Sequence, residues 1–266
     1  MTFEPALIAE LGLLGVVTGF VAGLLGIGGA MIMVPFVTIV LTNRGFPADY
    51  TLKAAVATSL ATICFTSLSS MRAHHQRGAV KWRIVALLAP GIVLGSLIGA
   101  QIGAHLPGKS LGILFGFFIA FSATQMILNR KPHGSRSLPG PAGMIGAGTA
   151  IGVVSAIVGA GGAFISVPFM TWCNVKIHDA VGTSAALGFP IALAGTVGYA
   201  WAARDLPAVA PGAVGYIYLP ALVAISAASM LLAPLGARTA HRMDIRPLRR
   251  IFAVVLYALS IYFFLR

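Results

Sequence analysis

Two glycine-rich tetrapeptides, each followed by a proline, are the stretches of this sequence best suited to chemistry. Gly26–Gly29 (GIGG) and Gly159–Gly162 (GAGG) end six residues before Pro35 and Pro168, inside apolar sequence without charge. A glycine inside a helix costs about 1 kcal/mol relative to alanine, and a proline about 3 kcal/mol. The repeated clusters therefore predict that a helix ends and another begins. A helix start inside a membrane presents free N–H groups, which suit an anion.

We expect an anion to lie where two such helix starts converge, since each carries roughly half a positive charge. The next segment of each half supplies hydroxyl donors that bind an oxyanion at low desolvation cost. The candidate substrate-binding residues are Gly26, Gly28, Gly29, Thr58, Ser59, Gly159, Gly161, Gly162, Thr183 and Ser184. Two alternatives stay open: glycines can serve helix packing, as we expect for Gly12, Gly15, Gly19 and Gly23, and hydroxyls can bond to carbonyls of their own helix.

The composition places these motifs in a membrane. Of the 266 residues, 58% are hydrophobic and 9% are charged, so charge-free runs recur along the whole chain. The runs are continuous rather than alternating, which favours membrane-spanning helices over a barrel. The net charge of +12 does not indicate nucleic-acid binding, because the basic residues lie in short loops where cytoplasmic loops of membrane proteins carry them.

The apolar runs predict an all-α protein built from two halves of five segments each. Residues 1–129 and 141–266 form the halves, and the basic stretch 130–140 links them. The predicted segments are 5–25, 30–41, 52–71, 84–105 and 111–128, then 143–158, 163–172, 179–201, 213–236 and 251–265. A single helix over 5–41 would be about 55 Å long, against roughly 30 Å of hydrocarbon. A hairpin at the glycines fits better, and whether 30–41 and 163–172 cross fully or re-enter stays open.

Charge in the loops predicts how the halves are related. The loops 72–83, 130–140 and 237–250 are basic, so we expect them in the cytoplasm, and the nearly neutral loop around Arg204 and Asp205 outside. This neutral loop is the repeat partner of the basic loop 72–83, so partner loops lie on opposite faces. The halves are therefore expected to be inverted repeats, with the N-terminus and the C-terminus both outside.

The motifs resemble the TauE/SafE family of sulfite exporters. The resemblance rests on both glycine clusters, on Val34-Pro35 and Val167-Pro168, and on the two Thr-Ser pairs, and it covers nearly the whole chain. It implies a bacterial or archaeal inner-membrane transporter of sulfite, organosulfonates or other small organic anions. Ala160 stands where the first cluster has Ile27, and we expect only a slight asymmetry of packing.

The function we expect is secondary transport of a small anion by alternating access, one half rocking against the other. Sulfite or an organosulfonate such as sulfoacetate or taurine is favoured; a carboxylate, sulfate or thiosulfate is the alternative, and a channel stays open. The direction of transport, the coupling ion and a homodimer also stay open. We expect no enzyme, catalytic residue, metal or cofactor: HExxH and paired intramembrane aspartates are missing from the sequence, and all six acids lie at segment ends or in loops.

Overall fold

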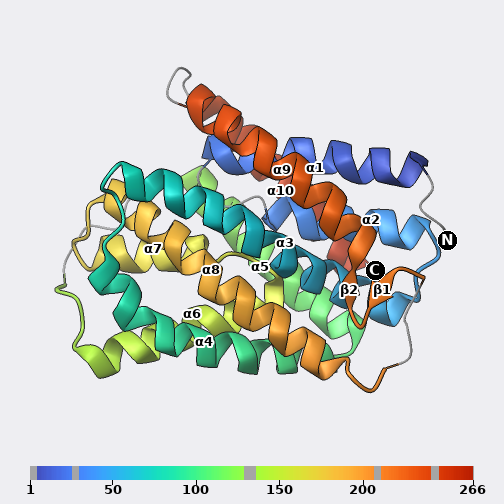
Figure 1. Cartoon of the computed structure of the whole chain (residues 1–266), viewed down its shortest axis with the longest axis horizontal. Coiled ribbons are helices and arrows are strands. Elements are labelled where there is room, and N and C mark those ends of the chain that lie inside the picture. Colours follow the sequence, from blue (N-terminus) through green and yellow to red (C-terminus); the bar gives the residue numbers. More distant parts are fainter. Residues whose placement is uncertain (1–4, 26–29, 129–135, 207–210, 241–245, 266) are drawn as a thin grey trace.

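Long helices form almost all of the protein. The computed structural model describes residues 5–25, 30–128, 136–206, 211–240 and 246–265 (Figure 1). The first half contains α1 (Pro5–Leu25), α2 (Ala30–Asn43), α3 (Ala48–Gln76), α4 (Trp82–His105) and α5 (Gly108–Leu128). The second half contains α6 (Pro141–Val158), α7 (Ala163–Trp172), α8 (Ile177–Ala202), β1 (Ala213–Val214), β2 (Ile217–Tyr218), α9 (Leu219–Ala240) and α10 (Arg246–Leu265). The helical architecture predicted from the sequence is confirmed.

The start of the predicted segment 213–236 is wrong, because α9 begins only at Leu219. Residues 213–218 instead form a β-hairpin, in which β1 and β2 pair antiparallel. Gly215 takes a φ of +57° at the first of the two turn residues, a conformation that tight hairpin turns require and that glycine adopts without strain. Pro220 then occupies the first turn of α9, where its missing N–H is not needed.

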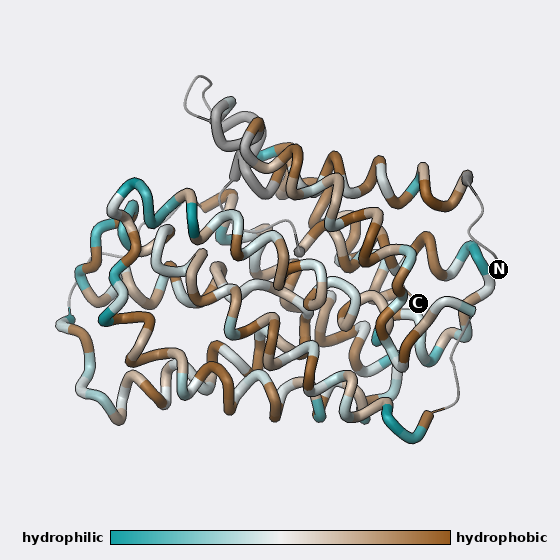
Figure 2. The backbone as a smooth tube through the Cα atoms, in the orientation of Figure 1, coloured by the Kyte–Doolittle hydropathy of each residue, from teal (hydrophilic) through white to brown (hydrophobic). Residues whose placement is uncertain are grey.

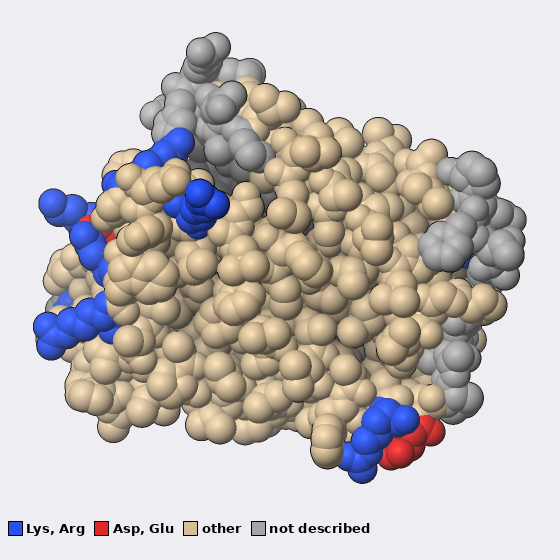
Figure 3. All heavy atoms as spheres, viewed as in Figure 1, with Lys and Arg blue, Asp and Glu red and all other residues tan. Residues whose placement is uncertain are grey.

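The surface of the molecule is that of a multi-pass membrane protein. Among the described residues, five helices are long and apolar enough to cross a membrane, namely α3, α4, α5, α6 and α8. Large apolar side chains point outward, and Phe117 and Val223, for example, are 65% and 66% exposed. Hydrophilic segments gather toward the two ends of the long axis (Figure 2). The middle of the face shown in Figure 3 carries no Lys, Arg, Asp or Glu.

The central helices α3 and α8 run in opposite directions and define the two ends of the molecule. Tyr216, in the β-hairpin, lies beside Tyr50 at the start of α3 and beside Tyr199 at the close of α8. Lys81, just after α3, forms an ion pair with Asp179 at the start of α8. We call the first region, with the loop 44–47 and the hairpin 213–218, the hairpin end. The second, with residues 77–81, 136–140 and 173–176, is the linker end.

Helices of the two halves are interleaved. The most extensive contacts join α4 to α6 and α1 to α9, and α5 packs against α10. Small residues allow this close approach: Gly15 and Gly19 of α1 face the backbone of Ile225 and Ser229 in α9. Their predicted packing role is confirmed, whereas Gly12 faces open space and Gly23 lies outside the described side chains.

Candidate anion-binding site

The second glycine cluster separates α6 from α7. Helix α6 ends at Val158, and Gly159 follows in the left-handed conformation with a φ of +67°. Helix α7 begins at Ala163, directly after Gly162, whose φ is +76°. The helix break predicted at this cluster is confirmed. Gly26, Gly28 and Gly29 lie outside the described residues, between the end of α1 and the start of α2.

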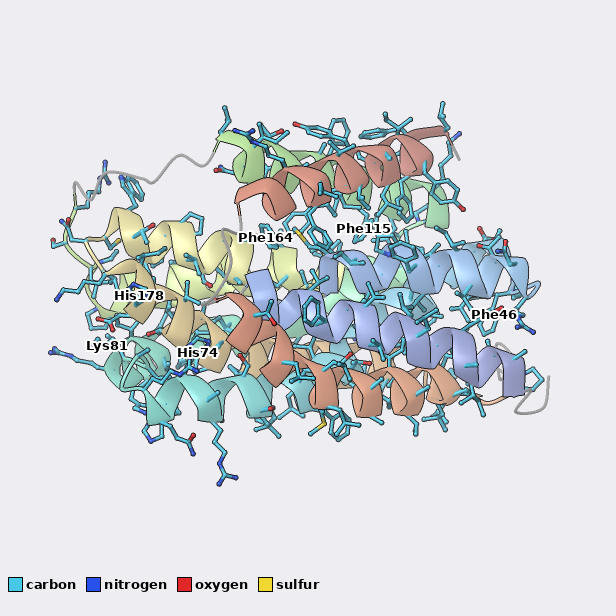
Figure 4. The ribbon with its side chains drawn as sticks, turned by 90° about the horizontal axis from the view of Figure 1, so that it is seen from above. Phe46, His74, Lys81, Phe115, Phe164 and His178 are labelled. Carbon is cyan, nitrogen blue, oxygen red and sulfur yellow. The ribbon has the colours of Figure 1, made fainter. Side chains whose placement is uncertain are left out.

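The break is held against the first half of the chain. A Cβ at Gly159 would lie 3.0 Å from Cγ2 of Val34 in α2 and 3.1 Å from Cα of Val56 in α3. Ser59 of α3 donates a hydrogen bond from Oγ to the carbonyl oxygen of Gly159 at 3.0 Å. Phe164, in the first turn of α7, lies near the middle of the long axis (Figure 4). The sequence needs glycine here both for the backbone conformation and for this close approach.

The start of α7 offers backbone donors. The Gly162 carbonyl accepts from the N–H groups of Ile165 and Ser166, at 3.1 and 2.9 Å. Residue 162 is the N-cap position, and as glycine it has no side chain to cap the helix. Ala163 and Phe164 are the first two residues of α7. Their N–H groups have no acceptor within the helix, because no helical carbonyl lies before them in the chain. Together with the helix dipole, they create a region of positive potential.

Hydroxyl groups gather around the same break. Ser155, on the last turn of α6, is 1% exposed, and its Oγ has no hydrogen-bond partner among the described residues. This oxygen lies 3.1 Å from the position that a Cβ at Gly162 would take. Ser166 of α7 and Ser184 of α8 share a hydrogen bond of 2.7 Å between their hydroxyls. The sequence did not single out Ser155 or Ser166, because only the folded break brings them to the start of α7.

The predicted hydroxyl residues separate into two groups. Ser59 and Ser184 reach the break or the helix that starts there. Thr58 and Thr183 instead accept hydrogen bonds from backbone N–H groups of the other half, those of Tyr218 and Lys81, each at 3.0 Å. The alternative that we left open was a hydrogen bond from each hydroxyl to a carbonyl of its own helix. The bonds found for Thr58 and Thr183 are of a different kind, because in them the hydroxyl oxygen accepts from the other half. Because each hydroxyl accepts here, its O–H remains able to donate.

Other chemistry has little support among the described residues. They contain no cluster of His, Cys, Asp or Glu that could hold a metal ion. One sequence pattern, Gly108–Gly112 (GKSLG), matches the G-x-S-x-G motif of serine hydrolases. It opens α5 after a helix, whereas a nucleophile elbow follows a strand. Ser110 is exposed there, and its position lacks the strand that a nucleophile elbow requires.

Comparisons with known proteins agree with this architecture. The profile of the family described as Sulfite exporter TauE/SafE matches residues 11–263. A protein of Haemophilus influenzae named "Probable membrane transporter protein" is 33% identical over 256 residues, which are 96% of this chain and 97% of that protein. YdhB of Bacillus subtilis, named in the same way, is 29% identical over 238 residues, 87% of this chain and 88% of YdhB. MJ0441 of Methanocaldococcus jannaschii is 23% identical over 263 residues, 95% and 94% of the two chains.

No solved structure matches this chain. The family match spans all the elements that form the break between α6 and α7 and nearly the whole of the remaining chain. The chain therefore belongs to the sulfite exporter TauE/SafE family of membrane transporters.

Proposed function

We propose that this protein is a secondary transporter of small anions, with sulfite or an organosulfonate as the favoured substrate. The observation that carries the proposal is the start of α7, where Gly162 leaves backbone N–H groups uncapped beside the unpartnered hydroxyl of Ser155. A buried hydroxyl without a partner costs free energy that a ligand can recover. An oxyanion accepts from N–H and O–H donors alike, so it fits this set better than a cation would.

The proposal extends to the first glycine cluster by the inverted repeat. Thr58 and Thr183 occupy matching positions in α3 and α8, and their partners Tyr218 and Lys81 each directly precede the fourth helix of a half. The contacts between helices follow the same exchange between halves. Helix α1 of the first half packs on α9 of the second, and α6 of the second half packs on α4 of the first. Two inverted halves with interrupted helices are a common transporter plan, with the substrate near the midplane. The start of α2, directly after the first glycine cluster, would then be the second helix start.

The interleaved packing supports moving units that differ from the sequence halves. Helices α1 and α9 belong to different halves but share one extensive contact, and so do α4 and α6. A motion of one sequence half against the other would break both contacts. We therefore propose that α1 with α9 and α4 with α6 move as units about the central pair α3 and α8. Hydrogen bonds that link these units to α3 and α8 would then decide which end of the molecule is open to solution.

The charge at the two ends supports the proposed orientation, with both termini outside and the linker in the cytoplasm of a bacterial or archaeal inner membrane. Among the residues whose side chains the structure describes, the linker end carries seven cations and one acid: Arg72, Arg77, Lys81, Arg83, Arg136, Lys176 and Arg250, with Asp179. The hairpin end carries four cations and three acids: Arg44, Lys53, Lys109 and Arg204, with Glu10, Asp49 and Asp205. An excess of Lys and Arg marks cytoplasmic loops.

Thermal unfolding of the purified protein in detergent tests the substrate class. The panel is sulfite, sulfate, thiosulfate, taurine, sulfoacetate, acetate and chloride. A ligand that binds only the folded state adds about 2.7 kcal/mol at 100 times its Kd. A rise of Tm confined to sulfite and sulfonates supports the favoured substrates, and flux of the same anions into proteoliposomes, saturable and with counter-transport, separates a transporter from a channel. A rise with carboxylates alone would move the substrate to another organic anion.

A further inference from the structure

Lys53 is a largely buried lysine in the second turn of the membrane helix α3, counted from its hairpin end. Its side chain belongs to a residue that is only 8% exposed. A lysine residue is rarely this buried without a paired charge. The Nζ of Lys53 is not among the fully buried polar atoms that lack a partner, so the ammonium remains reachable from solvent. The predicted helix 52–71 included this residue, but the sequence alone gave no reason to expect its burial. Its surroundings therefore need to offset the charge.

The protein offsets this charge only weakly. The Nζ atom lies 6.0 Å from the ring centroid of Tyr50 and 5.9 Å from that of Tyr216. Contacts of a cation with ring faces contribute less free energy than full desolvation of an ammonium costs. Among the described residues, no carboxylate lies within ion-pair distance of Lys53; Asp49, one turn earlier, is exposed and acts from farther away. The ammonium thus retains capacity for an anionic partner.

Two tyrosine rings lie beside this ammonium, and a third packs against one of them. The rings of Tyr50 and Tyr216 lie 6.2 Å apart, and the ring of Tyr199 lies 6.1 Å from that of Tyr216. Burial raises the pKa of the Tyr216 phenol, and the nearby Tyr50 raises it further, so this phenol stays a proton donor at neutral pH. Two residues later, Tyr218 is bonded through its N–H to Thr58. The β-hairpin therefore closes over Lys53 from the second half of the chain.

We propose that Lys53 binds a small monoanion at the hairpin end, in a site distinct from the start of α7. One ammonium neutralises one negative charge, and a dianion would leave a second charge buried and uncompensated beside Asp49. Sulfonates, carboxylates and hydrogen sulfite meet this condition, whereas sulfate does not. Lys53 precedes Thr58 by five residues, about 7.5 Å along the helix. Resting on the proposed function, this site would select the substrate before it reaches the start of α7.

Calorimetric titration of the full chain in detergent tests this site, with methanesulfonate as the monoanion and sulfate as the dianion. We expect wild type to bind methanesulfonate at two sites and sulfate at the Lys53 site at least about tenfold more weakly, a difference of about 1.4 kcal/mol. Lys53→Met keeps the apolar stem and should lose one site, whereas Lys53→Arg keeps the charge and should retain both. Lys109→Met is the matched control, because Lys109 is an exposed lysine of the same end.

The outcomes separate this inference from the proposed function. Gly162→Ala should remove the site at the start of α7 and leave the Lys53 site intact. Loss of one site in Gly162→Ala with two intact sites in Lys53→Met would overturn the Lys53 site and leave the proposed function standing. The reverse pattern would leave Lys53 standing alone. A single methanesulfonate site in wild type, lost in Gly162→Ala, would also overturn it, whether or not Lys53→Met folds.

Discussion

Thr58 Oγ1 accepts a hydrogen bond from the backbone N–H of Tyr218 at 3.0 Å, across 160 positions of sequence. The bond fastens the β-hairpin of the second half to α3 of the first. Thr183 makes the equivalent bond with the N–H of Lys81 at the other end of the molecule. The two bonds thus tie the loop before α9 to α3 and the loop before α4 to α8. We interpret them as the tethers that hold the two ends closed.

Removing one tether should open one end only. Thr58→Val leaves the Tyr218 N–H without its acceptor and should cost about 1–3 kcal/mol of the closed arrangement. In a background without Cys64 and Cys173, the reporters are Ala55→Cys in α3 and Ala180→Cys in α8, two fully buried alanines at matching positions. We expect Thr58→Val to raise maleimide labelling of the first reporter about fivefold or more and to leave the second unchanged.

Thr183→Val should give the opposite pattern, with faster labelling at residue 180. Thr62→Val is the matched control, because Thr62 is a buried threonine of α3 whose hydroxyl bonds to the carbonyl of Thr58 in its own helix. It should change neither rate. Equal acceleration at both reporters by either variant would mean that the threonines contribute to general stability and do not act as separate tethers.

Gly162→Ala should abolish anion binding at the start of α7. The φ of +76° costs an L-residue about 1–2 kcal/mol, so the backbone would relax and turn the first N–H groups of α7 away from the ligand. Isothermal titration with sulfite and methanesulfonate measures the loss. Gly146→Ala is the control, since Gly146 lies in α6 outside the candidate site, its φ is not positive and a Cβ there would meet nothing within 4 Å. Wild-type affinity in Gly162→Ala would rule out this helix start as the site.

Ser155→Ala should weaken anion binding without weakening the fold. The hydroxyl is buried and unpartnered in the absence of ligand, so its removal should leave the unliganded protein unchanged or up to about 1 kcal/mol more stable. Loss of one donor to a charged ligand should lower the affinity about tenfold or more. Thermal unfolding with and without sulfite measures both effects in one experiment.

Ser226→Ala provides the comparison for that experiment. Ser226 of α9 is also buried, and its Oγ also has no partner among the described residues. Its removal should change the stability of the unliganded protein in the same way and leave the shift of Tm by sulfite intact. An equal loss of the shift in both variants would show that the effect comes from burial alone and does not report a ligand contact.

The helix ends could be predicted where glycine and proline mark them. The bounds of α1 and α7 agree with the sequence prediction, and at α7 the helix begins directly after Gly162, which has a left-handed conformation. The β-hairpin could not be predicted in the same way. Its strands are two residues long, too short for an alternating pattern, and the apolar run continues through them into α9.

The surroundings of single residues depended on contacts between distant segments. The ammonium of Lys53 lies beside the ring of Tyr216, which belongs to the other half of the chain. Ser155 is one serine among many in the sequence, and its lack of a partner follows only from the packing of α6 at the break. Thr58 and Thr183 were predicted as ligands of the anion, and that role stays a prediction. Their bonds to Tyr218 and Lys81 could not be inferred from local sequence.

The orientation of the chain can be tested with two engineered cysteines. Asp205→Cys lies at the hairpin end and Gln76→Cys at the linker end, and both positions are exposed. Cys173 is buried, and burial raises its pKa, with Arg136 opposing the shift, so it should react slowly, but it and Cys64 are best replaced first. In intact cells, a membrane-impermeant maleimide should label residue 205 and spare residue 76, which should react only after permeabilisation. Labelling of both positions in intact cells, or of residue 76 alone, would contradict the proposed orientation, which places the linker end in the cytoplasm because of its excess of Lys and Arg.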